Sequence, residues 1–275
     1  MKRKIVADSS VDIQNLSQME FVSVLLTIHA GDASFRDDEA LAVGEMVQYL
    51  RNYKGKSSTA CPSAGDFLAA FGEAEEVFCF TITSKLSGAY QAACIAKEEY
   101  ESTHPDRRVC VVDSLSTGPE MRLLAEKVES LTAEGKSFEE TEAEVRAYSN
   151  RTQLMFMLES LKNLANNGRV SHAVAKITGI LGIRLVGKAQ EGELFPLDKC
   201  RGLKKALDAM VERMKSLGYR GGKVHIAHCF HPEAAHALLE LLRQEFKNLC
   251  AEIYPTGGLC SFYAELGGLL VGFET

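Results

Sequence analysis

The segment from residue 77 to residue 93 is the part of this sequence that most constrains the fold. Val77 to Ile82 is a short apolar run bounded by polar residues, which predicts a buried strand. From Ala89 onward, strong helix formers and apolar residues near helical spacing predict a helix. The turn between them, Thr83 to Gly88, is rich in hydroxyl groups. Because the free N–H groups and the positive dipole end of the helix face this turn, it can bind an anion.

Ser87 and Gly88 are the residues of this turn nearest the helix. Ser87 is expected at the N-cap, where its side-chain oxygen would accept a hydrogen bond from the backbone. Gly88 has no side chain, so a ligand can approach its backbone closely. A serine that only caps the helix explains the same residues, and on this segment alone that structural interpretation is favoured over a binding role.

The length and composition are those of an ordinary globular protein. A chain of 275 residues can bury a large core and is expected to form two domains or lobes. The formal net charge of -6 argues against a general nucleic-acid binder and against docking on an anionic membrane. The N-terminus lacks the apolar segment of a signal peptide, and no apolar run is long enough to span a membrane. The eight cysteines are scattered singly, without a CxxC pair, which predicts reduced thiols in a cytoplasmic protein.

Predicted strands and helices alternate through residues 1–150. Besides residues 77–82, strands are expected at 4–7, 21–28 and 109–112. Helices are expected at 39–53, 121–131 and 137–149, and a further helix is expected to begin at a capping box at Ser63. This alternation predicts an α/β lobe with a mainly parallel sheet, flanked by helices, with ligand loops at its carboxyl edge. Hydroxyl groups are expected there on loops 8–10, 83–87 and 113–117, and the Ser58–Thr59 loop is a candidate to join them. Segments 31–38 and 54–63 are expected to be irregular.

Residues 151–275 predict a second α/β lobe with a mixed sheet. A hairpin turn is expected at Glu191-Gly192, and a helix ended by a glycine C-cap at 161–169. Further strands are expected at 153–158, 194–197, 223–229 and 251–254 and at the C-terminus, and further helices at 202–217 and 232–246.

Two segments in this half resemble ligand-binding motifs but do not meet the requirements of those motifs. Residues 182–189 nearly spell a P-loop, but the Ser/Thr that would hold magnesium is missing and the interior is apolar like a strand. His225, His228 and His231 look metal-like, yet residues three apart on a strand face opposite sides. Structural histidines are therefore the favoured interpretation, and no metal site is expected.

Several short motifs in a fixed order give the chain a resemblance to a known family. In the first half they are Lys4 to Ser10 (KI-x-x-DSS), Ser58 to Ser63 (compare TTSQPS), Thr83 to Gln91 (compare SS-x-LSGTYQ) and Val111 to Gly118 (compare VIDS-x-x-x-x-G). In the second half they are Leu161 with Gly168-Arg169-Val170 (compare L-x-x-GGRI), and Arg201 with Lys204 to Ala206. On these motifs the whole chain, 1–275, resembles the DegV family of bacterial fatty-acid-binding proteins.

The resemblance implies a function and a site. In that family a long-chain fatty acid, such as palmitate, lies in a lipid tunnel between two α/β lobes, which here are 1–150 and 151–275. Carried over, Thr59 and Ser87 bind the carboxylate, and the Gly88 N–H is a further donor. Family members present the bound acid to a partner fatty acid kinase and perform no chemistry themselves. The resemblance thus implies a non-enzymatic protein with a role in lipid transport or fatty acid metabolism, with a bound fatty acid and no other cofactor.

One segment departs from the family pattern. Where the family reads roughly G-T-H-T-G-P-G-A, this chain reads GLCSFYAE from Gly258 to Glu265, so Cys260 replaces the histidine near the carboxylate. Ser261 is a candidate to supply a hydroxyl instead. Arg169 and Arg201 are cationic candidates for docking the kinase, and exposed arginines without a role explain them about equally well.

Two other functions stay open. Ser87 would serve as the nucleophile of a serine-dependent esterase or acyltransferase if the fold placed a general base beside it. The altered segment at Cys260 also leaves open a binder of another amphiphilic anion.

Overall fold

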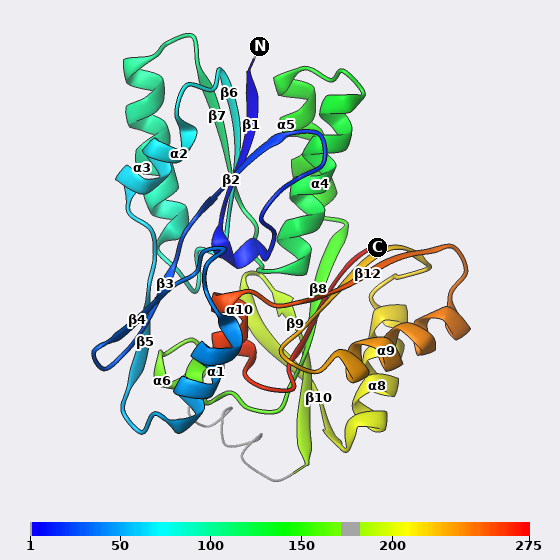
Figure 1. Ribbon diagram of the computed structural model, residues 1–275. Helices are drawn as coiled ribbons and strands as arrows, with labels where there is room; N and C mark the ends of the chain where they lie inside the picture. Colours follow the sequence, from blue (N-terminus) through cyan, green and yellow to red (C-terminus); the bar gives the residue numbers. More distant parts are fainter. Residues whose placement is uncertain (1, 172–181) are drawn as a thin grey trace.

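A four-stranded parallel sheet forms the centre of the N-terminal lobe in the computed structural model, which describes residues 2–171 and 182–275 (Figure 1). Its strands, in the spatial order β2-β1-β6-β7, are β2 (Glu20–Val24), β1 (Arg3–Asp8), β6 (Glu76–Thr81) and β7 (Arg108–Asp113). Every residue of β6 is buried, as its continuous apolar run predicts. The predicted mainly parallel sheet is therefore confirmed.

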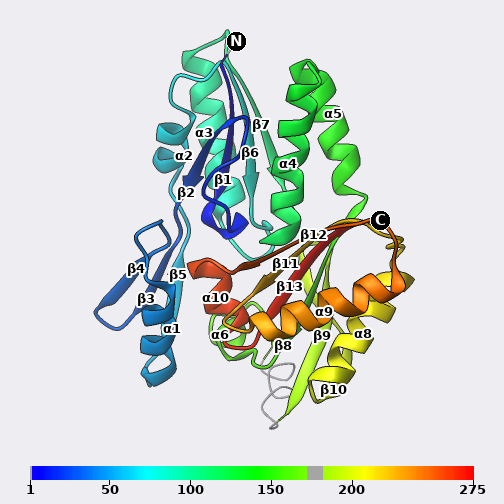
Figure 2. The same cartoon turned by 45° about the vertical axis from the view of Figure 1, so that its right-hand side comes forward.

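Helices cover both faces of this sheet (Figures 1 and 2). They are α2 (Ala64–Phe71) and α3 (Ala89–Thr103) on one face, and α4 (Pro119–Ala133) and α5 (Phe138–Ser149) on the other. The capping box predicted at Ser63 is present, because its hydroxyl accepts from the Asp66 N–H and the Asp66 carboxylate accepts from the Ser63 N–H. A short 3-10 turn, η1 (Ser9–Val11), follows β1.

The C-terminal lobe contains a six-stranded mixed sheet. Its strands, in the spatial order β10-β9-β8-β13-β11-β12, are β10 (Glu193–Arg201), β9 (Ile183–Gln190), β8 (Thr152–Leu158), β13 (Leu269–Glu274), β11 (Gly222–His228) and β12 (Leu249–Pro255). Only the β11–β12 pair is parallel. β9 covers the segment that nearly spells a P-loop, so its interpretation as a strand is confirmed, as is the hairpin turn at Glu191-Gly192.

The two faces of the six-stranded sheet pack against different parts of the molecule. Met155 and Met157 of β8 point to the outer face, where they pack in one core with α8 (Leu203–Ser216) and α9 (Pro232–Glu245). Leu154, Phe156 and Leu158 alternate with them on the inner face. The inner face also contacts α6 (Lys162–Asn166) and α10 (Gly258–Ala264). One strand therefore contributes both to the lobe's own core and to the space between the lobes.

A small third sheet was not predicted. Its strands β4 (Ala33–Arg36), β3 (Thr27–Ala30) and β5 (Ser57–Ala60) pair antiparallel, so the expectation that segments 31–38 and 54–63 are irregular was wrong. The apolar run 21–28 is likewise divided between β2 and β3, which belong to different sheets. Both outer strands are short, polar and partly exposed, so hydrophobic periodicity does not mark them.

The third sheet and α1 (Val43–Asn52) form an arm, residues 27–60, that reaches beside the C-terminal lobe (Figure 2). Ile28 and Met46 of the arm form a buried cluster with Phe262 of α10. In the other direction, Leu259 of α10 belongs to the core of the N-terminal lobe, while Cys260 and Ala264 belong to the inner-face cluster. The short helix α10, which was not predicted, therefore joins three apolar clusters.

The lobes also meet where α4 crosses β13. A side chain at Gly272 of β13 would place its Cβ 2.5 Å from the backbone of Pro119, so this approach requires glycine. Next to it, the buried carboxylate of Glu120 accepts a hydrogen bond from Thr152 Oγ1 at 2.8 Å. Burial raises the pKa of Glu120 to about 7, although the Thr152 hydrogen bond opposes the shift.

We predict a pH-dependent contribution of Glu120 to stability. Because the folded-state pKa lies above that of the unfolded chain, the folded state binds more protons between about pH 4.5 and 7. The free energy of unfolding should therefore fall as the pH rises through this range, by roughly 3 kcal/mol from this group. Urea denaturation of the wild type and of Glu120→Gln at pH 4.5 and pH 8 measures the effect. The variant should lack this part of the loss, and an identical pH dependence in both proteins would contradict the assignment.

Candidate functional site

A deep pocket lies between the two lobes and the arm. The empty space within it, counted together with the solvent at its mouth, is about 1000 Å³. Its walls are mainly apolar and come from both lobes: Leu26, Ile82, Leu86, Leu115, Leu154, Phe156, Leu158, Leu164, Ala189, Leu194, Leu259, Ala264 and Leu270. The inner face of β8 supplies three of these side chains. The pocket therefore suits a largely apolar ligand.

Several polar residues also line this pocket. They are Thr59, Cys61, Thr83, Ser87, Glu193, Ser116, Thr117, Arg169, Cys260 and Tyr263. The structure thus brings together Thr59, Ser87, Gly88, Cys260 and Arg169, all of which were named from the sequence. Thr83, Ser116 and Thr117 come from the predicted hydroxyl-bearing loops at the carboxyl edge of the parallel sheet.

Ser87 and Gly88 lie at the start of α3. Gly88, not Ser87, is the N-cap residue, so the predicted cap position was one residue too early. The Ser87 hydroxyl still accepts a hydrogen bond from the Ala89 N–H at 3.2 Å. The backbone turn is closed by the N–H groups of Leu86 and Ser87, which donate to the Thr83 carbonyl oxygen. Ser87 is half-buried and Gly88 is exposed, so this wall of the pocket is reachable from outside.

Thr59 reaches the pocket from β5 of the arm. Its backbone is paired with Ile28 in β3, and its hydroxyl is hydrogen-bonded to the Tyr263 hydroxyl at 2.8 Å. Tyr263, on α10, was not identified from the sequence. Burial raises the pKa of the Tyr263 phenol, while the Thr59 hydrogen bond and the charge of Arg169 lower it. The sequence did contain a signal for a pocket residue here. Tyr263 follows Cys260 by three residues, so in a helix the two side chains lie on the same face.

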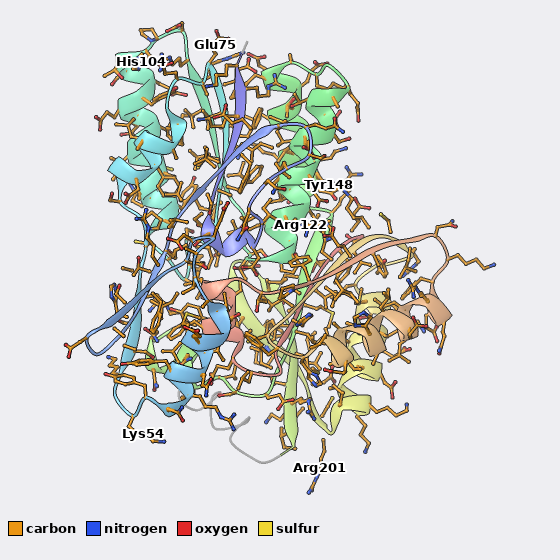
Figure 3. The ribbon with its side chains drawn as sticks, viewed as in Figure 1. Lys54, Glu75, His104, Arg122, Tyr148 and Arg201 are labelled. Atoms are coloured by element: carbon orange, nitrogen blue, oxygen red, sulfur yellow. The ribbon has the colours of Figure 1, made fainter. Side chains whose placement is uncertain are left out.

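Arg169 and Arg201 lie in different places. The Arg169 guanidinium lines the pocket, and its Nε donates to the Leu86 carbonyl oxygen at 3.1 Å. It therefore joins the end of α6 to the loop that carries Ser87. Arg201 is exposed at the end of β10 and points away from the molecule (Figure 3). Only Arg169 stands beside the candidate site.

Cys260 and Ser261 face different surroundings. The Cys260 thiol lines the pocket and donates to the Ser10 carbonyl oxygen at 3.3 Å. Burial, and next the charge of Asp12, raises its pKa well above the usual value. The Ser261 hydroxyl is instead paired with Thr256 Oγ1 at 2.7 Å and is not among the residues that line the pocket. Ser261 therefore lies outside this pocket.

Two buried carboxylates of the N-terminal lobe hold the start of α10. Asp37 accepts from the N–H groups of Gly258 at 2.7 Å and Leu259 at 3.0 Å, and Asp12 accepts from the Gly257 N–H at 3.0 Å. Burial raises the pKa of both carboxyl groups, and the charge of Asp37 raises that of Asp12 further. These bonds satisfy N–H groups that the first turn of a helix leaves free. They therefore fix the helix that carries Cys260 and Tyr263.

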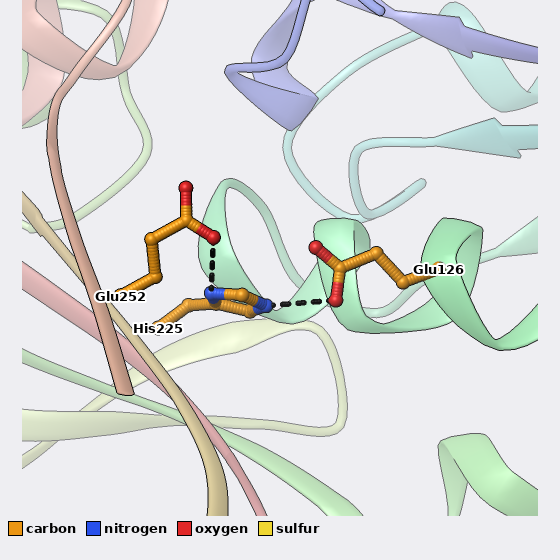
Figure 4. A group of neighbouring side chains, drawn as sticks. All are labelled: Glu126, His225 and Glu252. Carbon is orange, nitrogen blue, oxygen red and sulfur yellow. Dashed lines mark hydrogen bonds and ion pairs between the residues drawn. The ribbon is translucent and has the colours of Figure 1, made fainter. Parts of the chain in front are cut away.

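A separate polar group joins the lobes at α4. The buried His225 of β11 lies between Glu126 and Glu252, with 3.0 Å from its Nε2 to Glu126 Oε2 (Figure 4). Arg122 contacts both carboxylates, at 2.8 Å and 2.6 Å, and Lys223 contacts Glu126 at 2.9 Å. Burial raises the pKa of Glu126, but its positive partners outweigh burial and lower it. Because two side-chain cations already neutralise the carboxylates, we interpret the group as an ion-pair network between the lobes.

The geometry does not favour hydrolysis by Ser87. A nucleophilic serine needs a general base within hydrogen-bond reach. Among the described residues, no histidine lines the pocket, and the Ser87 hydroxyl is engaged by the Ala89 N–H rather than by a general base.

Fold and pocket together define a two-lobed α/β protein with a deep apolar pocket that carries a limited set of polar groups between its lobes.

Comparison with known proteins gives the family. The DegV family model, described as an uncharacterised protein family, matches residues 2–275. A DegV domain-containing protein of Streptococcus pneumoniae R6 is 42% identical, and the alignment covers 100% of this chain and 99% of the relative. The chain belongs to the DegV family.

Two solved structures are similar over almost the whole chain. One is the fatty acid kinase (Fak) B3 protein of Streptococcus pneumoniae loaded with linoleic acid (42% identity, TM-score 0.98, 100% of this chain and 99% of that one). The other is a DegV family protein of Eubacterium eligens loaded with heptadecanoic acid (41% identity, TM-score 0.97, 99% of each chain). The two-lobed α/β fold expected from the resemblance is confirmed. Within residues 2–171 and 182–275, no helix combines the length and the apolar character needed to cross a bilayer.

We predict that Asp37 stabilises the fold through α10. Asp37→Ala would leave two buried N–H groups without partners, which should lower the free energy of unfolding by roughly 2–4 kcal/mol. Asp38→Ala is a matched control, because the Asp38 carboxylate accepts a local bond from the Ala40 N–H at 3.0 Å and none from α10, and it should cost less than about 1 kcal/mol. Urea denaturation at pH 8 measures both. Equal losses in the two variants would show that the contact with α10 does not matter.

Proposed function

We propose that this protein binds a long-chain fatty acid, such as palmitate, in the pocket between its lobes. The observation that carries the proposal is the combination of a deep apolar pocket with hydroxyl groups at a helix start. It is supported by the fatty acids bound in two similar structures that share about two fifths of their residues with this chain. The two lobes that enclose the ligand are residues 1–150 and 151–275.

In this proposal the carboxylate lies against Thr59, Ser87 and the Gly88 N–H. A carboxylate is costly to bury unless hydrogen bonds replace its hydration. Hydroxyl donors from β5 and from the start of α3 supply such bonds, and the positive end of the α3 dipole favours the negative charge. Cys260 lines the same pocket, but its thiol already donates to the Ser10 carbonyl oxygen. We therefore propose that Cys260 contacts the ligand without binding its carboxylate.

The acyl chain supplies most of the affinity. Palmitate has roughly fourteen methylene groups, and burying each is worth about 0.8 kcal/mol, or on the order of 11 kcal/mol before losses. Ordering the flexible chain and restricting its motion reduces this sum. The leucines of both lobes and Phe156 provide the apolar walls for this burial. The tail therefore provides affinity, while the polar groups determine which end of the ligand faces outward.

We further propose that the protein presents the carboxylate to a partner fatty acid kinase and performs no chemistry itself. The exposed Gly88 and half-buried Ser87 leave this end of the pocket accessible to another protein. Arg169 stands beside it and is the favoured cation for docking a phosphate-handling enzyme, whereas Arg201 lies far from it. Neither a metal nor another cofactor is needed. All eight cysteines are free thiols, which fits a cytoplasmic location.

Native mass spectrometry of the freshly purified protein tests the ligand and the site together. We predict a mass excess equal to a long-chain fatty acid, and its loss or strong reduction in the Thr59→Ala/Ser87→Ala double variant. The matched control is Ser58→Ala/Ser84→Ala, which removes two exposed hydroxyls, one from β5 and one from the turn before α3, and should retain the ligand.

Three results would contradict the proposal in different ways. An excess that survives in the double variant would keep the lipid but move its carboxylate elsewhere. No excess, with no uptake of added palmitate, would favour another amphiphilic anion. Covalent labelling of Ser87 by a fluorophosphonate would favour the esterase or acyltransferase instead.

A further inference from the structure

Contacts of its helix and of its ring hold Tyr263 in place. The N-terminus of its helix, α10, is fixed by the Asp12 and Asp37 carboxylates. Its ring packs edge-on against Phe262, with ring centroids 4.8 Å apart, and Phe262 is itself buried against the arm. The phenol hydroxyl therefore has a defined position, and that position is 2.8 Å from Thr59 Oγ1.

The hydrogen bond between these two hydroxyls restricts the Thr59 proton. Only one proton can lie between the two oxygen atoms. If Tyr263 donates, Thr59 accepts, and the Thr59 proton is free to point toward a third group. If Thr59 donates, its proton is used and it can offer a ligand only lone pairs. A carboxylate accepts hydrogen bonds and donates none, so a bound carboxylate favours the first arrangement.

We propose that Tyr263 is a positioning residue that directs the Thr59 hydroxyl proton toward the bound carboxylate, and that this pair makes the pocket select an ionised acid over a neutral lipid of the same length. The inference rests on the proposed function. The Cys260 thiol is directed to the Ser10 carbonyl oxygen, so it does not orient a donor toward the carboxylate. In this proposal the Tyr263 hydroxyl does so through Thr59.

The selectivity follows from the strength of the bond that Thr59 makes. Hydrogen bonds to an ionised acceptor are roughly twice as strong as bonds between neutral groups. A fatty alcohol offers the same tail but no charge, so it gains little from a proton held in one direction. Arg169, which also lines the pocket, adds a positive charge near Tyr263 that favours the anion. Without the phenol hydroxyl, Thr59 would rotate freely and this advantage would shrink.

The test compares palmitate with 1-hexadecanol in delipidated protein. In Tyr263→Phe, which keeps the ring, the dissociation constant for palmitate should rise about tenfold while that for 1-hexadecanol changes less than about twofold. Tyr49→Phe is the matched control. It removes a phenol hydroxyl that donates to the Ala30 carbonyl oxygen at 3.4 Å, in the arm that carries Thr59 but outside the pocket, and should change neither constant.

Two additional measurements separate positioning from packing. The carboxyl carbon of bound [1-13C]palmitate should titrate at a higher pH in Tyr263→Phe than in the wild type, because a hydrogen bond to the charged form is weakened. In a Thr59→Val background, Tyr263→Phe should have no further effect on palmitate binding.

Four outcomes of these experiments would contradict the proposal, each in a different part. Equal losses for palmitate and the alcohol would show that Tyr263 only packs the pocket. An unchanged palmitate constant and carbon titration would remove any role for the phenol. A persistent effect in Thr59→Val would show that Tyr263 contacts the ligand directly rather than through Thr59. If the wild type binds neither lipid, the proposed function itself fails, and the inference fails with it.

Discussion

The contact between two buried carboxylates and the first amides of α10 is the interaction on which the pocket depends. Asp12 and Asp37 belong to the N-terminal lobe and its arm, whereas α10 belongs to the C-terminal part of the chain. Because α10 contributes to three apolar clusters, fixing its start also fixes how the lobes and the arm meet. Burial of these carboxylates is unfavourable, and the backbone N–H groups they bind offset that cost.

The pocket follows from this arrangement of elements. The carboxyl edge of the parallel sheet supplies hydroxyl-bearing loops, and the inner face of β8 supplies an apolar wall by simple strand alternation. α10 and the arm then close the space and bring Tyr263 to Thr59. The polar groups come from segments far apart in the sequence, so only the folded chain brings them together.

The sequence predicted the elements with strong local signals. The buried run of β6, the capping box at Ser63 and the hairpin turn before β10 were all correct, because each depends on neighbouring residues. β4 and β5 were missed, since short polar edge strands are defined by their partner β3 and not by their own composition. Ser87 and Gly88 were singled out from the strand–turn–helix pattern, the carboxylate-binding role of Thr59, Ser87 and Gly88 was inferred from the family resemblance, and that role stays a prediction. Tyr263 was missed, because α10 was not predicted and because its contact is with a residue 204 positions away.

The most direct test of the whole account is a crystal structure of the protein loaded with palmitate. The account predicts an acyl chain between the lobes along the inner face of β8, with its carboxylate within hydrogen-bond distance of the Thr59 and Ser87 hydroxyl oxygens. A chain that runs in the opposite direction, with its carboxylate away from both hydroxyls, or electron density for palmitate only on the outer surface, would contradict it.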